Sequence, residues 1–518
     1  MYSPNLQEVL RLAKHYNLIP VARKMMADTE TPIRVFRHLY REQRAFLLES
    51  VEGGVNWARY SFIGSDPFLV VRGKNGTMEV EQGGEKRTVQ EKPIELVKSL
   101  LGAYRSPRIA GLPPFTGGAI GFFGYDLLQY YERLPAHRND DLKMDDVHFM
   151  FCDQIIVFDH FKQQIKIIAN AHIKPGATDA EIVAAYEEAC AKIEAVAQKL
   201  KRPSLPDAPA AGTVPEDVEI GELKSNLTKD AYMEMVRKAK EYIAAGDIFQ
   251  VVLSQRFHIE TKISPLHVYR VLRTLNPSPY MYVLKFDDEV IVGTSPELLV
   301  KVDGGRVETR PIAGTRPRGR TTEEDLALEK ELLADEKERA EHLMLVDLGR
   351  NDIGRVSEFG TVSCDSFMEI ERYSHVMHIV SHVSGKLRGD KDFFDAFLSC
   401  LPAGTVSGAP KLRAMEIIAE LENEARGVYA GAIGYLGFSG NLNTCITIRT
   451  IVFKNGKAYV QAGAGIVADS VPENEYYETV NKAKGMLKAV RMAEAMFGAD
   501  EEIGGSPINR DYFIMGRS

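Results

Sequence analysis

The chain has 518 residues, of which 45% are hydrophobic, and its formal net charge at pH 7 is −8. This length predicts two domains, or one large layered unit, with a sizeable buried core. The acidic balance argues against nucleic acid as a partner, although a locally basic pocket can still bind a small anion. The five cysteines lie far apart without a CxxC pair. Their spacing therefore favours a reducing, cytoplasmic compartment over a disulfide framework or a cysteine zinc site.

The N-terminal stretch MYSPNLQEVLRLAKHYN carries charges within its apolar periodicity. It predicts an amphipathic helix and not a signal peptide. No apolar run reaches the roughly 18 residues of a membrane span, so we expect no membrane association.

Residues 1–202 predict an N-terminal α/β part. The runs FLVVRG, FMFCDQIIVFDH and QIKIIANAHI indicate strands, and residues 179–200 predict a long amphipathic helix. A proline-rich stretch at 203–225 predicts a linker, because four prolines stand among small and polar residues. The second part is expected at 226–495, followed by a C-terminal tail at 496–518.

The second part predicts antiparallel pairing. Turn residues join short strands over 280–310 and again over 427–463, whereas helical patterns cover 322–345 and 410–424. Hairpins that join successive strands favour an α+β fold with packed helices over a doubly wound parallel sheet.

A glycine pair stands in the stretch AGAGIV. Gly463 and Gly465 match the spacing of a dinucleotide-binding loop. That fingerprint requires the glycines to open a helix and a second strand to follow. Here Pro472 intervenes, and a helical pattern continues where that strand would lie. We therefore expect the glycines to admit a bound anion close to the backbone, not a dinucleotide.

Two carboxylate pairs share one helical spacing. Glu475 and Glu478 are three residues apart on one predicted helix, and Glu338 and Glu341 repeat this on another. Each pair also has a structural interpretation, an ion pair of Glu478 with a lysine four residues on and a capping box for Glu338. If the two helices face each other, the four carboxylates supply the hard oxygen ligands that Mg²⁺ prefers.

Arg449 lies in CITIRTIVF, where apolar residues occupy both alternating faces. This pattern predicts a strand buried on both sides. A buried arginine is costly unless an anion satisfies it, and a structural ion pair remains an alternative. Together these features suggest a small polycarboxylate substrate.

Several ordered motifs carry a resemblance that spans roughly residues 225–490. They are GDIFQVVLSQRF, GTSPELLV, RPIAGTRPRG, AEHLMLVDLGRND, HVMHIVSHV, LPAGTVSGAPK, GAIGY and AGAGIV…EYYET. The chain resembles the chorismate-binding enzymes, and among them the anthranilate synthase component I family. FLLES fits the same family in the N-terminal half.

The resemblance implies two large antiparallel sheets packed together with helices outside. It also implies Mg²⁺-dependent conversion of chorismate and ammonia into anthranilate and pyruvate, the first committed step of tryptophan biosynthesis. Glu297 would be the general acid that protonates the leaving C4 hydroxyl. His378, chosen among three neighbouring histidines by motif position, would assist pyruvate elimination. The implied metal ligands are Glu338, Glu341, Glu475 and Glu478.

The resemblance further implies a set of substrate-binding residues. Arg449 and Tyr429 would hold the enolpyruvyl carboxylate, and the other members would complete the pocket. The set is Gln250, Thr405, Tyr429, Arg449, Gly463 and Gly465.

Two positions discriminate within the family. Relatives that add water resemble this chain but carry a lysine, as general base, at the position of Gln250. The neutral amide of Gln250 cannot take a proton from water. Aminodeoxychorismate synthases carry a nucleophilic lysine where this chain has Ala313. Both substitutions favour ammonia as the nucleophile and anthranilate as the product.

Regulation and a partner are also implied. Two segments, FLLES and NPSPYM, resemble a tryptophan feedback pocket; without the family, a strand end and a proline-rich turn would be the better explanation. No cysteine stands in a glutaminase nucleophile motif, so ammonia would come from a separate glutamine amidotransferase subunit, component II, in a heterotetramer. The implied regulatory residues are Ser50, Asn276, Pro279, Tyr280 and Met281.

Two alternatives remain open at this point. One is an aminodeoxychorismate synthase component I, and the other is a tryptophan-sensing homologue without catalysis.

Overall fold

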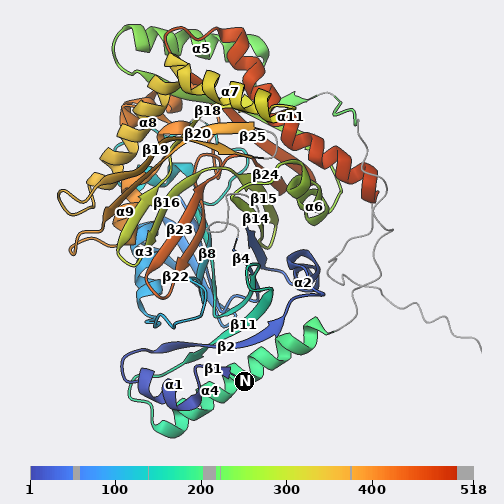
Figure 1. The fold of residues 1–518 in the computed structure, drawn as a ribbon, viewed down its shortest axis with the longest axis vertical. Helices are drawn as coiled ribbons and strands as arrows, with labels where there is room; N and C mark the ends of the chain where they lie inside the picture. Colours follow the sequence, from blue (N-terminus) through green and yellow to red (C-terminus); the bar gives the residue numbers. More distant parts are fainter. Residues whose placement is uncertain are drawn as a thin grey trace, which may run out of the picture.

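The computed structural model of the protein describes residues 2–50, 59–137, 139–201, 218–221, 223–373 and 376–498. These residues form two large β-sheets, of 13 and 12 strands, whose neighbouring strands pair antiparallel. The helices lie outside the sheets (Figure 1). The α+β fold of two packed antiparallel sheets is therefore confirmed.

The first sheet joins strands from both ends of the chain. In spatial order it contains β1 (Tyr2–Ser3), β2 (Leu18–Met26), β11 (Gln164–His172), β10 (Gln154–Asp159), β4 (Tyr60–Ser65), β3 (Ala45–Glu49), β14 (Tyr280–Lys285), β15 (Glu289–Ser295), β24 (Thr450–Lys454), β25 (Lys457–Ile466), β13 (Gln250–Glu260) and β12 (Lys224–Ser225), with β21 (Gly408–Ala409) paired to β13.

The second sheet is built in the same way. Its order is β18 (Ile312–Pro317), β20 (Val376–Lys386), β17 (Arg306–Thr309), β16 (Leu298–Asp303), β23 (Asn441–Ile446), β22 (Ala432–Gly437), β8 (Gly118–Phe123), β9 (Val147–Cys152), β5 (Leu69–Lys74), β6 (Thr77–Gln82) and β7 (Glu85–Gln90), with β19 (Ser363–Arg372) paired to β20.

The helices are mostly amphipathic and bury one face. They are α1 (Leu6–Leu12), α2 (Pro32–Leu39), α3 (Pro93–Gly102), α4 (Asp179–Leu200), α5 (Lys229–Ala244), α6 (Pro265–Leu275), α7 (Thr322–Ala334), α8 (Glu336–Gly354), α9 (Phe393–Cys400), α10 (Lys411–Leu421) and α11 (Pro472–Phe497), with 3₁₀ turns η1 (Tyr125–Tyr130) and η2 (Gly404–Val406). In the described ranges, no helix has the length and apolar character needed to cross a membrane.

Each sheet combines strands from the predicted parts 1–202 and 226–495, and the strands of each part lie side by side in it. In the first sheet β3 pairs with β14, and in the second β8 pairs with β22. Neither sheet thus belongs to one part alone. The predicted linker lies mostly in the undescribed residues 202–217, and the tail beyond Gly498 is likewise outside the described residues.

The chain passes directly from one sheet to the other at several points. Asp153 separates β9 from β10, Pro296 and Glu297 separate β15 from β16, and residues 447–449 separate β23 from β24. The last crossover corrects the expectation for Arg449. It does not lie within one doubly buried strand; it stands between two strands of different sheets, with φ +51°.

An apolar core fills the space between the sheets. It includes Phe46, Phe62 and Tyr282 from the first sheet, and Phe122 and Ile433 from the second. Two further clusters bury the outer faces beneath the helices. The sheets are therefore held as a rigid frame on which the crossovers present their side chains.

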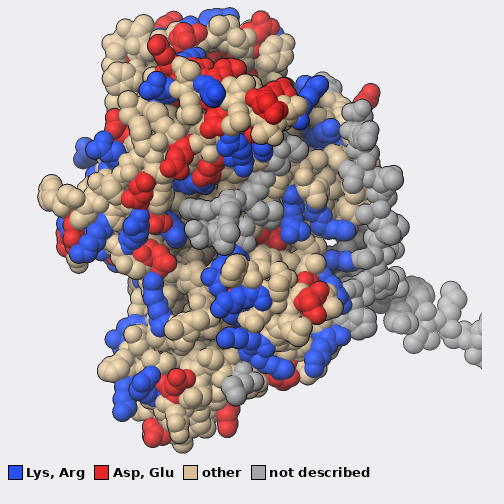
Figure 2. Space-filling model, viewed as in Figure 1, with Lys and Arg blue, Asp and Glu red and all other residues tan. Residues whose placement is uncertain are grey.

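On the surface, lysine and arginine are interspersed with aspartate and glutamate on the face drawn in Figure 2. That face has no stripe of one sign, and its charges would steer neither a polyanion nor a polycation as a whole.

Candidate active site

A cavity of about 120 Å³ lies where β25, α11, η2 and the 447–449 crossover meet. Its lining comes from segments far apart in the sequence. It includes Thr405, Tyr429, Arg449, Gly463, Gly465, Gln461, Lys482 and Met486. Five of the six predicted substrate-binding residues therefore line one cavity.

Gln250, the sixth, stands at the start of β13 beside the same wall. A Cβ added to Gly465 would lie 2.5 Å from Gln250 Nε2, and one added to Gly463 would lie 2.7 Å from Tyr429 Oη. Both glycines lie inside β25 and not at the start of a helix. The glycine pair is thus explained by the close approach of two polar side chains.

Glu297 occupies the crossover between β15 and β16 and is 8% exposed. The Thr405 hydroxyl donates to its Oε1 at 3.1 Å. Burial raises the pKa of Glu297 to about 8, and the Thr405 bond opposes this shift only in part. Thr405 also lines the substrate cavity, so the carboxyl of Glu297 stands next to it in a neutral, proton-donating form near pH 7.

Arg449 lies in the 447–449 crossover and lines the cavity. Desolvation lowers its pKa from the ordinary value, while Tyr429 and Glu478 act in the opposite direction. Its carbonyl accepts a bond from Thr294 N at 3.1 Å, which fixes this crossover to β15. Arg449 also lines an outer hollow with Glu478 and Lys482, so it faces the anionic helix and the cavity together.

The four predicted metal ligands stand on α8 and α11. Partial desolvation raises the pKa of Glu341, and the nearby carboxylates of Glu338 and Glu478 raise it further. Desolvation and Glu478 likewise raise the pKa of Glu475. The two helices therefore bring their carboxylates within range of mutual repulsion.

These four carboxylates are not tightly clustered. Glu338 binds Arg316 at 3.3 Å, and Glu478 binds Lys482 at 2.6 Å. Only one of the two hydrogen bonds of the predicted capping box is present. The Asp335 side chain accepts from Glu338 N, but the Glu338 side chain bonds to Arg316 instead of the Asp335 backbone. A divalent cation fits this donor set, because it would relieve the repulsion and needs only oxygen ligands.

His378 lies on β20, opposite Thr315 of β18. Its Nδ1 is 2.9 Å from the Gly314 carbonyl oxygen and 3.0 Å from Thr315 Oγ1. Because a carbonyl only accepts, Nδ1 carries the proton and Nε2 remains a free base. Burial lowers the pKa of His378, and the positive charges of Arg449 and Arg310 add to this.

The two neighbouring histidines differ from His378. His382 Nδ1 pairs with Asp365 Oδ2 at 3.2 Å, and His375 lies outside the described residues. A structural role thus accounts for His382.

Two cations of the site had no predicted role there. Lys482 Nζ donates to Gly463 O at 2.9 Å and to Glu478 at 2.6 Å, so it joins β25 to the acidic helix. Arg426 is fully buried, pairs with Glu422 at 2.6 Å and donates to Val406 O at 2.7 Å. For each of them the sequence offers a single signal, a glutamate four residues earlier. That spacing is common on solvated helices, so it does not indicate a place in a site.

A second cavity, of about 210 Å³, lies between the two sheets. Four predicted regulatory residues line it, namely Ser50, Pro279, Tyr280 and Met281. Ser50 Oγ is buried without a hydrogen-bond partner among the described residues. Asn276 does not line the cavity, because its amide donates to Thr294 Oγ1 at 2.9 Å.

Comparison with known proteins gives a consistent result. Residues 37–488 match the family described as chorismate binding enzyme. Anthranilate synthase component 1 of Acetivibrio thermocellus is 55% identical over 496 residues, covering 95% of this chain and 99% of that relative. The protein of the same name from Aquifex aeolicus is 48% identical over 492 residues, covering 95% and 98%.

Solved structures agree. Anthranilate synthase component I from Streptococcus pneumoniae TIGR4 superposes with a TM-score of 0.73 at 42% identity. The match covers 85% of this chain and 94% of that chain.

Proposed function

The chain belongs to the chorismate-binding enzymes, and within them to the anthranilate synthase component 1 proteins; from this premise we propose that it converts chorismate and ammonia into anthranilate, pyruvate and water. The observation that supports the proposal is a buried acid beside a cavity that is lined by a guanidinium and the glycines of β25. Arg449 and Gly463 line that cavity, and Glu297 lines an adjoining one and accepts a hydrogen bond from Thr405, which lines both.

The anionic substrate is held by positive charge and bare backbone. Arg449 and Tyr429 bind the enolpyruvyl carboxylate, and Thr405 with the amides at Gly463 and Gly465 completes the contacts. Arg449 is suited to this role because its guanidinium is desolvated, and a carboxylate partner is worth more where water is excluded.

Mg²⁺ fits the acidic pairs on α8 and α11, and Glu338, Glu341, Glu475 and Glu478 would hold it. When bound, it would draw electron density toward the ring carboxylate of the substrate. The chain contributes the orientation of these carboxylates, since Arg316 and Lys482 each fix one of them.

Proton transfer is divided between two residues. Glu297 donates a proton to the departing C4 hydroxyl, which leaves as water while ammonia adds at C2. His378 then assists the elimination of pyruvate from the aminated ring, with Nε2 as the free base. An acid with a raised pKa and a histidine with a lowered pKa suit these opposite tasks near neutral pH.

We infer the identity of the nucleophile from two positions at which other members of the family carry a lysine and this chain does not. Gln250 cannot activate water, and Ala313 cannot attack the substrate. Ammonia is therefore the nucleophile, supplied by component II as a separate glutamine amidotransferase subunit in a heterotetramer. We further propose a cytoplasmic enzyme that tryptophan inhibits through the cavity between the sheets.

One assay tests the proposal against its alternatives. Pure protein is incubated with chorismate, ammonium and Mg²⁺, and anthranilate is followed by fluorescence. We expect anthranilate that disappears on addition of EDTA, and glutamine-dependent product only after component II is added. Aminodeoxychorismate as the accumulating product would favour the first alternative, and no product at all would favour a sensor.

A further inference from the structure

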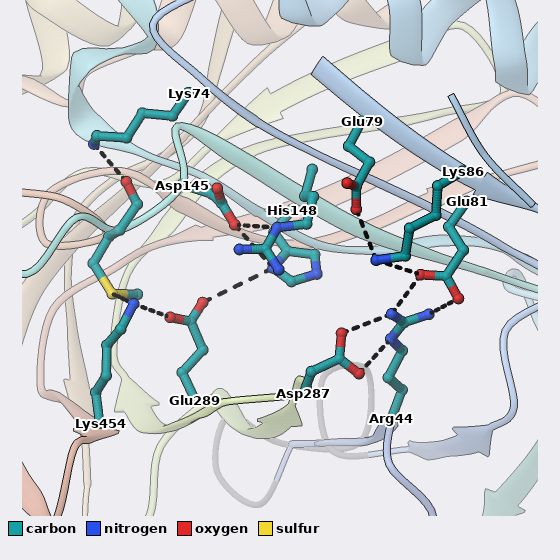
Figure 3. A network of polar contacts seen from close by, with 12 residues as sticks. Arg44, Lys74, Glu79, Glu81, Lys86, Asp145, His148, Asp287, Glu289 and Lys454 are labelled. Atoms are coloured by element: carbon teal, nitrogen blue, oxygen red, sulfur yellow. Dashed lines mark hydrogen bonds and ion pairs between the residues drawn. The ribbon is translucent and has the colours of Figure 1, made fainter. Parts of the chain in front are cut away.

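Three metal-ligating side chains meet between the two sheets, at a place separate from the candidate active site. His148 lies on β9 of the second sheet, Asp145 precedes that strand, and Glu289 begins β15 of the first sheet. Figure 3 shows the three side chains directed toward one another. Since β15 runs from Glu289 to Ser295, the group stands roughly 20 Å along the strand from the crossover of Glu297.

The spacing of the group is close to that of a coordination shell. His148 Nδ1 lies 3.5 Å from Asp145 Oδ2 and 3.9 Å from Glu289 Oε1. One donor atom of each residue lies within 4.8 Å of the others, the only such group of three among the described residues. Ligands of a tetrahedral zinc ion with bonds of about 2.1 Å stand about 3.4 Å apart. A small decrease in the distances between the three donor atoms would therefore bring them to the spacing of zinc ligands.

Three buried polar atoms of the group lack hydrogen-bond partners among the described residues, whereas the Asp145 oxygen nearest His148 is paired with Arg72. His148 is 1% exposed and Glu289 is 4% exposed. Neither ring nitrogen of His148, nor Glu289 Oε1, has a hydrogen-bond partner among the described residues. The His148 ring stacks on Phe286 with centroids 3.9 Å apart, which holds its plane. Buried polar atoms without partners call for an occupant.

The surrounding cations restrict which occupant fits. Arg72 Nε lies 3.0 Å from Asp145 Oδ2, and Lys454 Nζ lies 3.0 Å from Glu289 Oε2. They balance the two carboxylates, so an ion held by charge alone, such as Mg²⁺ or Ca²⁺, gains little. An ion that also bonds to imidazole, as Zn²⁺ does, gains a ligand that these cations do not offset. Lys454 engages the outer oxygen and leaves Oε1 facing His148.

We propose that Asp145, His148 and Glu289 form a second metal site that binds Zn²⁺, or a similar transition-metal ion, and joins the two sheets. Asp145 and His148 come from one sheet and Glu289 from the other, so the bound ion is a cross-link in the frame. Three protein ligands leave a fourth position for water. The site lies apart from the proposed Mg²⁺ ligands on α8 and α11.

Metal retention tests this site directly. The full chain is stripped with EDTA, returned to buffer with millimolar Mg²⁺, incubated with Zn²⁺, passed through gel filtration and analysed by mass spectrometry for zinc. We expect about one zinc per chain, and Zn²⁺ should raise the Tm by a few degrees because it binds the folded state. Chains without retained zinc, with a Tm that does not respond, would overturn the proposal in favour of a buried water.

Four variants separate this site from other zinc binding. His148→Ala and the near-isosteric Glu289→Gln should each weaken zinc binding at least tenfold; the second keeps a hydrogen bond to Lys454 in case the first does not fold. Glu341→Gln, in the proposed Mg²⁺ site, should retain zinc as the wild type does. Lys454→Met should bind zinc more tightly, since it removes an opposing charge. Equal retention in the wild type and Glu289→Gln, or weaker binding in Lys454→Met, would overturn the proposal.

Discussion

At the residue scale, burial sets the acid strength of Glu297. The carboxyl is 8% exposed and accepts from the uncharged Thr405 hydroxyl. No cation appears among the causes of its pKa shift, so desolvation prevails and the pKa rises to about 8. An acid of this strength remains protonated near neutral pH and can still give up its proton in a transition state.

The raised pKa of Glu297 predicts how the activity of the enzyme depends on pH. The profile of kcat/KM reports the pKa of an essential acid in the free enzyme, so it is the profile to measure. Because the acid form is active, kcat/KM should fall as pH rises through about 8. Glu297→Gln should lose ~10²–10⁴-fold in rate and the alkaline limb with it. Thr405→Val removes a bond that favours the charged form, so its limb should move to higher pH; a limb that stays in place in Thr405→Val would contradict the assignment.

The glycine wall gives a second residue-scale prediction. A Cβ at Gly463 would lie 2.7 Å from Tyr429 Oη, so Gly463→Ala should displace the tyrosine that faces the substrate. We expect KM for chorismate to rise about tenfold or more with a smaller change in kcat, as for an interaction made equally in the ground and transition states. Steady-state kinetics measures the split, and Gly456→Ala serves as a control, since no atom lies within 4 Å of a Cβ there. Its φ of +72° costs stability but leaves the pocket intact.

At the element scale, the crossovers hold the site together. The Ser295 hydroxyl donates to Ile446 O at 2.6 Å, and Ile446 N donates to Glu297 O at 3.0 Å. The first bond joins the segment that carries Glu297 to the segment that carries Arg449. The Glu297 carboxyl and the Arg449 guanidinium, our proposed acid and substrate-binding group, therefore share one support.

Ser295→Ala should loosen this support. The mutation removes one of two hydrogen bonds that the Ile446 carbonyl accepts, since Ile448 N also donates to it at 2.9 Å. We expect a cost of ~0.5–1.5 kcal/mol in the free energy of unfolding. It should also lower kcat/KM and shift the alkaline limb set by Glu297, which a purely structural defect would leave in place. Denaturant unfolding and pH profiles measure both effects.

Thr447→Val is the matched control. Thr447 lies in the neighbouring 447–449 crossover, directly after Ile446, and its Oγ1 is buried without a partner among the described residues. Replacing this hydroxyl by a methyl group should be neutral or stabilising. If both variants lost activity equally, the role of Ser295 as a support would be wrong.

Sequence patterns predicted most elements but not where the chain changes sheet. FMFCDQIIVFDH and CITIRTIVF are each continuous in β-forming residues, and nothing local marks Asp153 or Arg449 as a crossover. Helix α4, by contrast, was predicted at its observed bounds, because a capping box and a steady periodicity are local signals. The Asp145, His148 and Glu289 group was missed because Glu289 is distant in the sequence from the other two, so no local pattern joins the three.

At the scale of the whole molecule, the cavity between the sheets lies beside the strand ends that support Glu297. Tyr280 lines the cavity between the sheets and pairs in register with Ser295. Cys445 lines that cavity too, pairs with Leu298, and directly precedes Ile446 of the crossover. A ligand between the sheets would therefore contact Tyr280, the strand partner of Ser295, and Cys445, the chain neighbour of Ile446. Ser295 and Ile446 are the two residues whose hydrogen bonds support Glu297. Because such a packed frame has few intermediate positions, we expect a ligand in the cavity between the sheets to displace the support of Glu297.

This arrangement predicts inhibition by tryptophan through the cavity between the sheets. Tryptophan should lower anthranilate formation and, because it binds the folded state, raise the Tm in a concentration-dependent way. Ser50 Oγ is buried and unpartnered among the described residues, so the ligand should satisfy it. Ser50→Ala should then raise the inhibition constant about fivefold, equivalent to ~1 kcal/mol for one hydrogen bond, with unchanged activity in the absence of tryptophan. Full activity at millimolar tryptophan, or one inhibition constant for both proteins, would show that this cavity does not regulate the enzyme.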